Sequence, residues 1–271
     1  MKNLIDKKTI IIVSIVFVVI LAAMLLIVPI QRKNEFNAKW GKLAEFAETD
    51  KRAKFITENE DLYSKDILQY FYSNNDELDF VYNYAFHKDD YKTMSFTDEE
   101  LNNESVPALY MDDVRWAYED NFSIKTGGCA AVSLTMANLY LRNSSDVDPV
   151  KIMRYAKEMD YLGIFGGIKD ENIGDICDTI GLKAEVINLS ENMKKISHAD
   201  SEKIKFAIDS GHVIMAGMSG EIFGVHAIII RDYSGNDFFI NDPADPEKTA
   251  QIWSFDTIDS EMVYMYDISK K

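Results

Sequence analysis

Residues 126–142, TGGCAAVSLTMANLYLR, and residues 225–243, VHAIIIRDYSGNDFFINDP, set the architecture of this 271-residue chain. In the first stretch, apolar residues follow Cys129 at intervals of three and four, which predicts a helix from Cys129 to Arg142. In the second, an apolar run, a Ser-Gly pair and a shorter apolar run predict a β-hairpin. The sequence therefore predicts a cysteine at the start of a helix and a later strand pair that carries a histidine and an aspartate.

Further strand-like runs lie on both sides of this hairpin. Helical patterns come first along the chain and strands come later, an order that is typical of an α+β domain. We therefore expect a mostly antiparallel sheet with helices on one side. The predicted strands are residues 184–189, 212–218, 225–233, 237–241, 250–255 and 262–266.

Residues 31–103 are predicted to form a helical region that precedes this domain, which we expect at residues 104–271. Apolar residues recur in the region with a helical period, and aromatic residues concentrate between residues 63 and 91. The sequence SNN at residues 73–75 favours a turn or a helix cap between two short helices. Because aromatic stripes at helical spacing usually indicate a core, we expect a packed helical lobe here rather than a cage for a ligand.

The N-terminal segment has the pattern of a membrane anchor. Residues 9–30 contain no charged residue, and a helix of that length spans about 33 Å, close to the hydrocarbon thickness of a bilayer. Lysines precede the run within a tail at residues 1–8, and Arg32 and Lys33 follow it. A cleaved signal peptide, the alternative, lacks a small-residue cleavage site at the end of the run. We expect an uncleaved, single-pass signal anchor, whose orientation the charges on its two sides leave open.

Charge and composition exclude several classes of protein. The formal net charge is −16, and residues 1–40 carry six Lys or Arg against two acidic residues, which leaves −20 on the remainder. Such a body repels polyanions, so we expect no nucleic acid partner. Two cysteines exclude a disulfide scaffold and a Cys₄ zinc site. The chain also lacks HExxH, paired CxxC and GxxxxGK[ST] motifs. We therefore expect no metal ion and no cofactor.

Cys129 is the candidate nucleophile. A helix N-terminus has unpaired backbone N–H groups and the positive end of the helix dipole, and both favour a thiolate over a thiol. The alternative, a small buried apolar residue, is common for a free cysteine and stays open on these grounds. Cys177 lies in a helical pattern over residues 173–180 without such an environment, and we expect it in the core.

His226 is the candidate base, because the hairpin gives it an acid. If the turn centres near Ser234, the numbers of paired residues sum to about 468, and His226 lies opposite Asp242. A carboxylate there holds the imidazole in one tautomer. A shift of register by two residues keeps both side chains on one face, whereas a shift by one separates them. The other histidines, for which we find no orienting acid and expect solvated or structural roles, are His87, His198 and His212.

Several motifs, in the same order, are similar to those of a known family. The chain resembles the C39-like cysteine peptidases of the papain-like superfamily over about residues 63–266. The similar segments are DFVYNY at 79–84, which matches the family's helical lead-in; MDDVRWAY at 111–118, which matches QxDPRWGY; GCAAVS at 128–133, which matches the GCGPTS nucleophile turn; and VHAIII at 225–230 with NDP at 241–243, which match GHFIVL and NDP.

The resemblance implies a papain-like fold, in which the nucleophile helix packs on a mostly antiparallel sheet. It implies a thiol peptidase in which Cys129 attacks, His226 acts as general base and acid, and Asp242 orients the imidazole. The oxyanion region, by the same resemblance, includes Met111 and Gly128. The family has Gln at the position of Met111, whose thioether cannot donate a hydrogen bond. The loss of one such donor costs on the order of 10²-fold to 10³-fold in rate.

The function expected from the resemblance and the N-terminal segment is that of a bacterial, membrane-anchored cysteine peptidase. Its substrate would be a peptide or protein, and its C-terminal domain would lie outside the cytoplasm, with a single-pass helix in the cell membrane. Met111 favours an alternative, a catalytically impaired domain that binds a peptide or cell-wall component in the former cleft. A third interpretation is an amidase or acyltransferase that uses the same Cys129 and His226.

Overall fold

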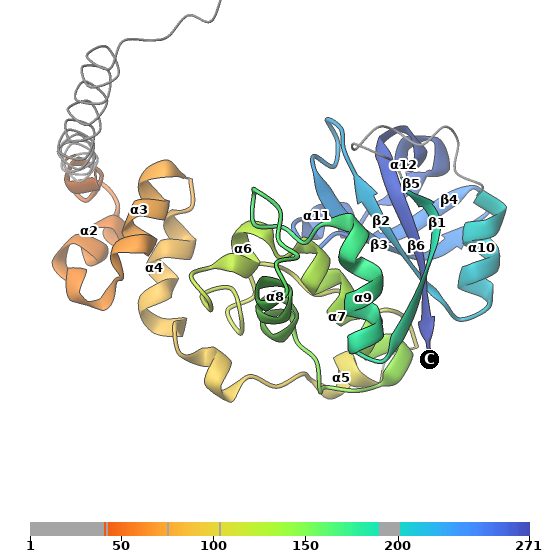
Figure 1. Ribbon diagram of the computed structural model, residues 1–271. Coiled ribbons are helices and arrows are strands. Elements are labelled where there is room, and N and C mark those ends of the chain that lie inside the picture. The colour runs from red at the N-terminus through yellow and green to blue at the C-terminus, as the bar shows by residue number, and fades with distance from the viewer. Residues whose placement is uncertain (1–40, 42, 75, 103, 190–200) are drawn as a thin grey trace, which may run out of the picture. The chain divides into compact units, whose positions relative to one another are not determined.

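The computed structural model describes residues 41, 43–74, 76–102, 104–189 and 201–271 (Figure 1). The chain divides into two compact units, Met1–Ala85 and Phe86–Lys271. The predicted tail at residues 1–8 and the predicted anchor at residues 9–30 lie outside the described residues. Within the described part of the chain, no helix combines the length and the apolar character needed to cross a membrane.

The first unit is a lobe of short helices. They are α2 Lys51–Glu58, α3 Lys65–Ser73 and α4 Leu78–His87, with the 3₁₀ turn η1 Glu60–Leu62. Asp50 and Ser64 cap the N-termini of α2 and α3, because each side chain accepts a hydrogen bond from a backbone N–H of the first turn. Asn74 ends α3, so the predicted turn between two aromatic helices is confirmed. The buried side chains of the lobe include Ile56, Ile67, Phe71, Tyr72, Phe80 and Val81.

The second unit is built on a six-stranded antiparallel sheet with the strand order β1-β6-β2-β3-β4-β5. Every predicted strand is present, which confirms the α+β class. The strands are β1 Leu182–Leu189, β2 Val213–Met218, β3 His226–Ser234, β4 Asp237–Asn241, β5 Ile252–Ser254 and β6 Met262–Lys270. The helices are α5 Asp98–Leu101, α6 Ser123–Gly127, α7 Cys129–Arg142, α8 Pro149–Glu158, α9 Ile173–Thr179, α10 Ser201–Asp209, α11 Pro246–Thr249 and α12 Phe255–Glu261, with the 3₁₀ turns η2 Asp90–Thr93 and η3 Asp170–Asn172.

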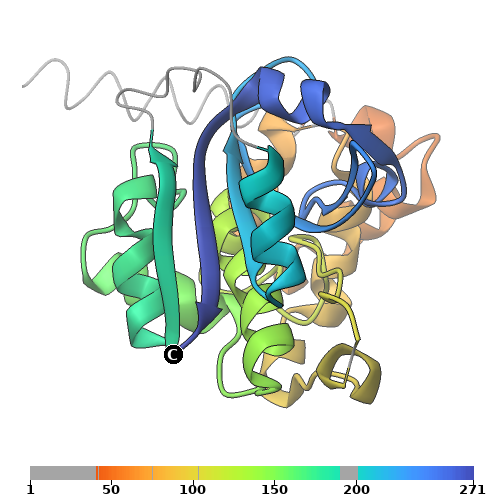
Figure 2. The ribbon, with the colours of Figure 1, turned by 90° about the vertical axis from the view of Figure 1, so that its right-hand side faces the viewer.

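Helices cover both faces of the sheet. All six residues of β2 are buried; Val213 and Met215 share a core with α7, whereas Ile214 and Ala216 share a second core with α10. Figure 1 shows α7 and α9 on one side of the strands and α10 on the other, and Figure 2 looks onto the α10 side. The prediction of helices on one side only is therefore wrong, because a strand that is apolar at successive positions needs cover on both faces.

The β3–β4 hairpin has a different register from the predicted one. The turn lies further along the chain, and the pairing near it is displaced by three residues. A bulge after Ile230 adds an unpaired residue to β3 and reduces the displacement from three residues to two. Beyond the bulge, Ile229 pairs with Asn241. The remaining displacement of two residues is even, so His226 and Asp242 still lie on the same face. The two residues come together, although they are not the directly opposed pair that the sequence predicted.

Candidate active site

Cys129 is the first residue of α7, as predicted. The short helix α6 leads into it, and Gly128 lies between the two helices with φ −85° and ψ 6°. A Cβ atom on Gly128 would lie 2.6 Å from the carbonyl oxygen of Ile124, so only glycine fits this junction. Gly128 supplies no side-chain cap. The N–H of Ala130 therefore remains available to the Cys129 sulfur, to which it hydrogen bonds.

His226 begins β3, and Asp242 directly follows the last residue of β4. The Nε2 atom of His226 lies 2.7 Å from Oδ1 of Asp242, and the two side chains are 10% and 1% exposed. The carboxylate is fixed in place, because Oδ1 also accepts a hydrogen bond from the Ala244 N–H and the Asp242 N–H donates to Thr249 Oγ1. The aspartate thus holds the imidazole by Nε2 and leaves Nδ1 for another partner.

That partner is Cys129, whose side chain hydrogen bonds to His226. Burial alone would raise the pKa of the thiol, but the hydrogen bond and charge of His226, together with the N–H groups of Ala227 and Ala130, lower it below its usual value. Burial likewise opposes the charge on His226, yet Asp242 and the Cys129 thiolate raise the pKa of the imidazole to about 9. Each group therefore stabilises the charged form of the other, a thiolate at Cys129 and an imidazolium at His226.

The pair opens onto a cavity of about 430 Å³, a volume typical of ligand sites. A narrow loop forms one wall: Leu162 bridges Ile168, and the N–H of Gly163 donates to the Gly167 carbonyl. At its tip, the side chains of Ile164 and Phe165 are almost fully exposed. The loop therefore places apolar side chains at the rim of the cavity.

Met111, which the resemblance assigned to the oxyanion region, also lines this cavity. Its side chain is buried, and its N–H donates a 2.7 Å hydrogen bond to the Pro243 carbonyl, directly after Asp242. The backbone therefore fixes Met111 beside the His226–Asp242 pair. Its thioether offers no donor there, which leaves backbone N–H groups at the start of α7 to stabilise an oxyanion.

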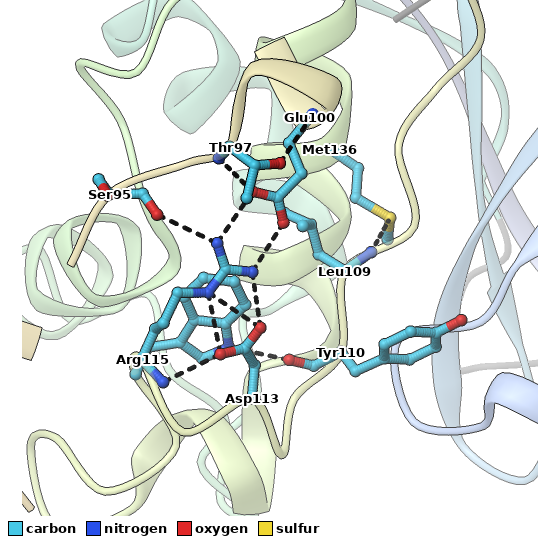
Figure 3. A network of polar contacts seen from close by, with 9 residues as sticks. Ser95, Thr97, Glu100, Leu109, Tyr110, Asp113, Arg115 and Met136 are labelled. Carbon is cyan, nitrogen blue, oxygen red and sulfur yellow. Dashed lines mark hydrogen bonds and ion pairs between the residues drawn. The ribbon is translucent and has the colours of Figure 1, made fainter. Parts of the chain in front are cut away.

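An ion-pair network holds the segment that contains Met111 (Figure 3). The Arg115 guanidinium lies between the carboxylates of Asp113 and Glu100, at distances of 2.6 and 2.7 Å from its Nη2 atom. It also stacks over the ring of Trp116, whose Nε1–H donates to the Tyr110 carbonyl. Asp112 is exposed, but Asp113 is a partly buried partner of the arginine.

His226 is not the only histidine with an acid partner, and in this respect the prediction was wrong. His212 Nδ1 lies 2.8 Å from Asp267 Oδ1 on β6, and His87 Nδ1 lies 2.7 Å from Asp90 Oδ2. His212 precedes β2, at the opposite end of that strand from the residue that pairs with His226. His198 lies outside the described residues.

Cys177 is fully buried in α9, and the prediction of a core residue is confirmed. Burial and the nearby charge of Asp178 raise the pKa of its thiol to about 12, so this cysteine stays protonated and unreactive. The two cysteines of the chain thus have opposite electrostatic environments, and the pKa is lowered only at Cys129.

Sequence reasoning missed two features of the cavity. Tyr264 on β6 lies in its wall, with its ring across Gly217 on β2. Glu261 holds the loop before His226, because its carboxylate accepts hydrogen bonds from the N–H groups of Ile222 and Phe223. Both contacts join segments that are far apart in sequence, and no local pattern marks either of them.

The model of the Peptidase_C39 like family matches residues 111–270, more than half of the chain. The chain belongs to this family. Its α+β fold, with the nucleophile helix against an antiparallel sheet and a helical N-terminal region, is the fold of C39 and papain-like peptidases. The sequence-based predictions of this family and of its α+β fold are confirmed, whereas the predicted transmembrane helix lies outside the described residues.

Solved structures similar to this C39-like chain include two bacterial domains. The peptidase domain of Streptococcus ComA, a bifunctional ABC transporter involved in a quorum-sensing pathway, is 12% identical with a TM-score of 0.38, over 53% of this chain and 92% of that one. A putative C39-like peptidase from Bacillus anthracis is 14% identical with a TM-score of 0.35, over 62% of this chain and 99% of that one. No curated protein sequence matches the chain.

Proposed function

We propose that this C39-like domain is a cysteine peptidase that hydrolyses a peptide bond through Cys129. The observation that carries the proposal is the series of contacts from Cys129 to His226 to Asp242 at the wall of one cavity. These contacts supply a nucleophile whose pKa is lowered, a proton donor beside it, and an acid that fixes the imidazole. Membership of the family supports a peptide as the substrate.

The reaction follows from these positions. The Cys129 thiolate attacks the carbonyl carbon of the scissile bond, and the carbonyl oxygen becomes an oxyanion. His226 gives its Nδ1 proton to the leaving nitrogen, the C–N bond breaks, and an acyl thioester with Cys129 remains. Water then attacks the thioester while neutral His226 takes its proton. The C–S bond breaks, the acid product leaves, and the thiolate–imidazolium pair is restored.

Met111 supports a second candidate, a domain that binds a peptide but cleaves it slowly or not at all. Backbone N–H groups alone would stabilise the oxyanion, and a missing side-chain donor costs on the order of 10²-fold to 10³-fold in rate. The low pKa of Cys129 and the fixed imidazole favour the peptidase, because a binding module needs neither.

Covalent labelling tests the proposal. A peptide with a thiol-reactive electrophile should label the full-length protein once, and Cys129→Ala should abolish the label. Cys177→Ala is the matched control, because it removes the other cysteine of the chain and should leave labelling intact. Hydrolysis of a pool of fluorogenic peptides by the wild-type protein and not by Cys129→Ala completes the test. Labelling without hydrolysis would favour the binding module, and absence of both would contradict the peptidase.

We further propose that residues 9–30 anchor the chain in the cell membrane, with the peptidase domain outside the cytoplasm. The uncharged run and its flanking basic residues support the anchor. The protein should fractionate with membranes, and protease added to intact cells should remove the C-terminal domain. If the domain is digested only after lysis, it lies in the cytoplasm and the proposed orientation is wrong.

A further inference from the structure

Two acidic residues line the cavity beside Cys129. Asp170 and Glu171, in the 3₁₀ turn η3, line its wall, and their carboxyl groups hydrogen bond to each other. No ion pair within the described residues involves either of them. Lys169 also lines the cavity, but its Nζ atom donates to the Asp160 carbonyl. Burial and the contact with Glu171 raise the pKa of Asp170, whereas the hydrogen bond from Asp170 and the charge of Lys169 lower that of Glu171, so the negative charge of the pair lies on Glu171 and no ion pair holds it.

An unpartnered tyrosine lies in the same cavity. The Tyr264 side chain is only 7% exposed, yet its hydroxyl makes no hydrogen bond within the described part of the chain. A phenol on a buried side chain usually has a hydrogen-bond partner, so this hydroxyl is available to a ligand in the cavity. The ring lies across Gly217, where a Cβ atom would be 1.9 Å from a ring carbon. Burial raises the pKa of Tyr264, and Cys129 and then Asp170 raise it further, so the hydroxyl is near both groups.

The walls of the cavity match a long side chain with a charged end. Ile164, Phe165 and Val225 are exposed apolar residues that line it with Cys129. Lysine and arginine bury an aliphatic stem against apolar surface and direct the charged group toward polar partners. Such a side chain would cover the exposed apolar residues, and its cationic group would meet the Asp170–Glu171 carboxyl pair and the Tyr264 phenol.

We propose that the cavity contains a subsite for a lysine or arginine side chain of the peptide substrate, in which Asp170 and Glu171 bind the cation and the Tyr264 hydroxyl accepts a hydrogen bond from it. The inference rests on the proposed function only in taking a peptide as the ligand. It makes Asp170, Glu171 and Tyr264 determinants of specificity that no local sequence pattern marks.

Equilibrium binding to the full-length Cys129→Ala protein tests the subsite without requiring catalysis. Each probe set consists of three peptides that are identical except at one position, which carries lysine, norleucine or glutamate. The varied position differs from set to set, so that the sets together scan the length of the peptide. At one position, lysine should bind at least tenfold more tightly than norleucine, and glutamate more weakly than norleucine. Asp170→Asn with Glu171→Gln should bring the ratio of lysine to norleucine affinity close to one. Tyr264→Phe should reduce the same ratio severalfold, because it removes only the hydroxyl.

A matched control removes two acidic residues elsewhere. Asp232→Asn with Asp237→Asn changes the net charge equally on the exposed β3–β4 hairpin, outside the cavity lining, and should leave the preference for lysine intact. If lysine and norleucine bind equally at every position, or if the control lowers the ratio as much as the cavity variant does, the subsite is overturned. Labelling and hydrolysis by the wild-type protein report separately on the peptidase, so either proposal can fail while the other stands.

Discussion

Two histidine–aspartate pairs lie near opposite ends of β2, and only one of them belongs to a candidate active site. His226 and Asp242 are 2.7 Å apart, and His212 and Asp267 are 2.8 Å apart. The first pair is almost fully buried, with side chains 10% and 1% exposed, whereas the second is 35% and 20% exposed. The distance between imidazole and carboxylate does not distinguish the two pairs.

The difference lies in what surrounds each imidazole. The free nitrogen of His226 faces a cysteine at the start of a helix, and the pair opens onto a cavity. His212 shares a surface recess with Lys270 and Glu104, and no cysteine is among the residues that line this recess. A histidine oriented by an acid is therefore common enough to occur twice on one sheet. The nucleophile, its helix terminus and the burial of the acid turn one of the two into a site for chemistry.

The largest expected effect comes from the two histidines. His226→Ala should lower kcat/KM for peptide hydrolysis by about 10³-fold or more, because it removes both the proton donor and the charge that stabilises the thiolate. Alkylation of Cys129 by iodoacetamide at neutral pH should slow by about tenfold or more, since the thiol becomes mostly protonated. His212→Ala should leave both rates within twofold of wild type. Equal effects of the two substitutions would remove the distinction between the pairs.

Substitution of Met111 tests whether the lack of a side-chain donor to the oxyanion limits the rate. Met111→Gln should raise kcat by about tenfold to 10²-fold, because a side-chain amide can donate to the oxyanion where the thioether cannot. Alkylation of Cys129 builds no oxyanion, so its rate should stay within twofold. Met159→Gln, on an exposed methionine at the end of α8, is the matched control and should change neither rate. A gain in alkylation as large as the gain in kcat would indicate a change in the thiol rather than an added donor.

The two aspartates should differ in the pH profile. The kcat/KM of wild type should rise with pH through the lowered pKa of Cys129 and fall through the pKa of His226, about 9. Asp242 raises the pKa of His226, so Asp242→Asn should lower it and move the alkaline limb to lower pH. A shift by one pH unit, or 1.4 kcal/mol, would cost roughly tenfold in rate on that limb. Asp267→Asn should not move either limb. An unchanged alkaline limb in Asp242→Asn would assign it to another group.

Local sequence patterns predicted the elements of the fold well. The apolar period after Cys129 gave the bounds of α7, and the alternating and continuous apolar runs gave all six strands, because local side-chain spacing determines which faces can be buried. The same patterns placed His226 and Asp242 on one hairpin. The bulge after Ile230 was not predictable, since no residue type specifies where a strand takes in an extra residue.

Contacts between distant strands could not be read from the sequence. Asp267 meets His212 only because β6 lies beside β2, a neighbour 55 residues away along the chain. Tyr264 lies across Gly217 for the same reason. The turn residues of a hairpin predict that its two strands pair, but the order of strands within a sheet depends on packing over the whole domain. The sequence therefore indicated the candidate nucleophile and its candidate base, and missed the residues that shape the cavity.

The smallest expected effect concerns stability at the outer pair. Asp267→Asn should lower the free energy of unfolding by less than about 1 kcal/mol, because a partly exposed contact between an imidazole and a carboxylate gains little over the solvated groups. This loss should shrink further in 1 M salt, where the screening length is about 3 Å. Denaturant titrations of wild type and variant at low and high salt measure it. Tyr233→Phe, which removes a hydroxyl bonded to Asp209 without changing the charge at neutral pH, is the control and should show no dependence on salt. A loss of several kcal/mol in Asp267→Asn would mean that the His212–Asp267 contact is important for folding, as expected of a buried contact. The greater exposure of this pair would then no longer explain why it differs from the His226–Asp242 pair.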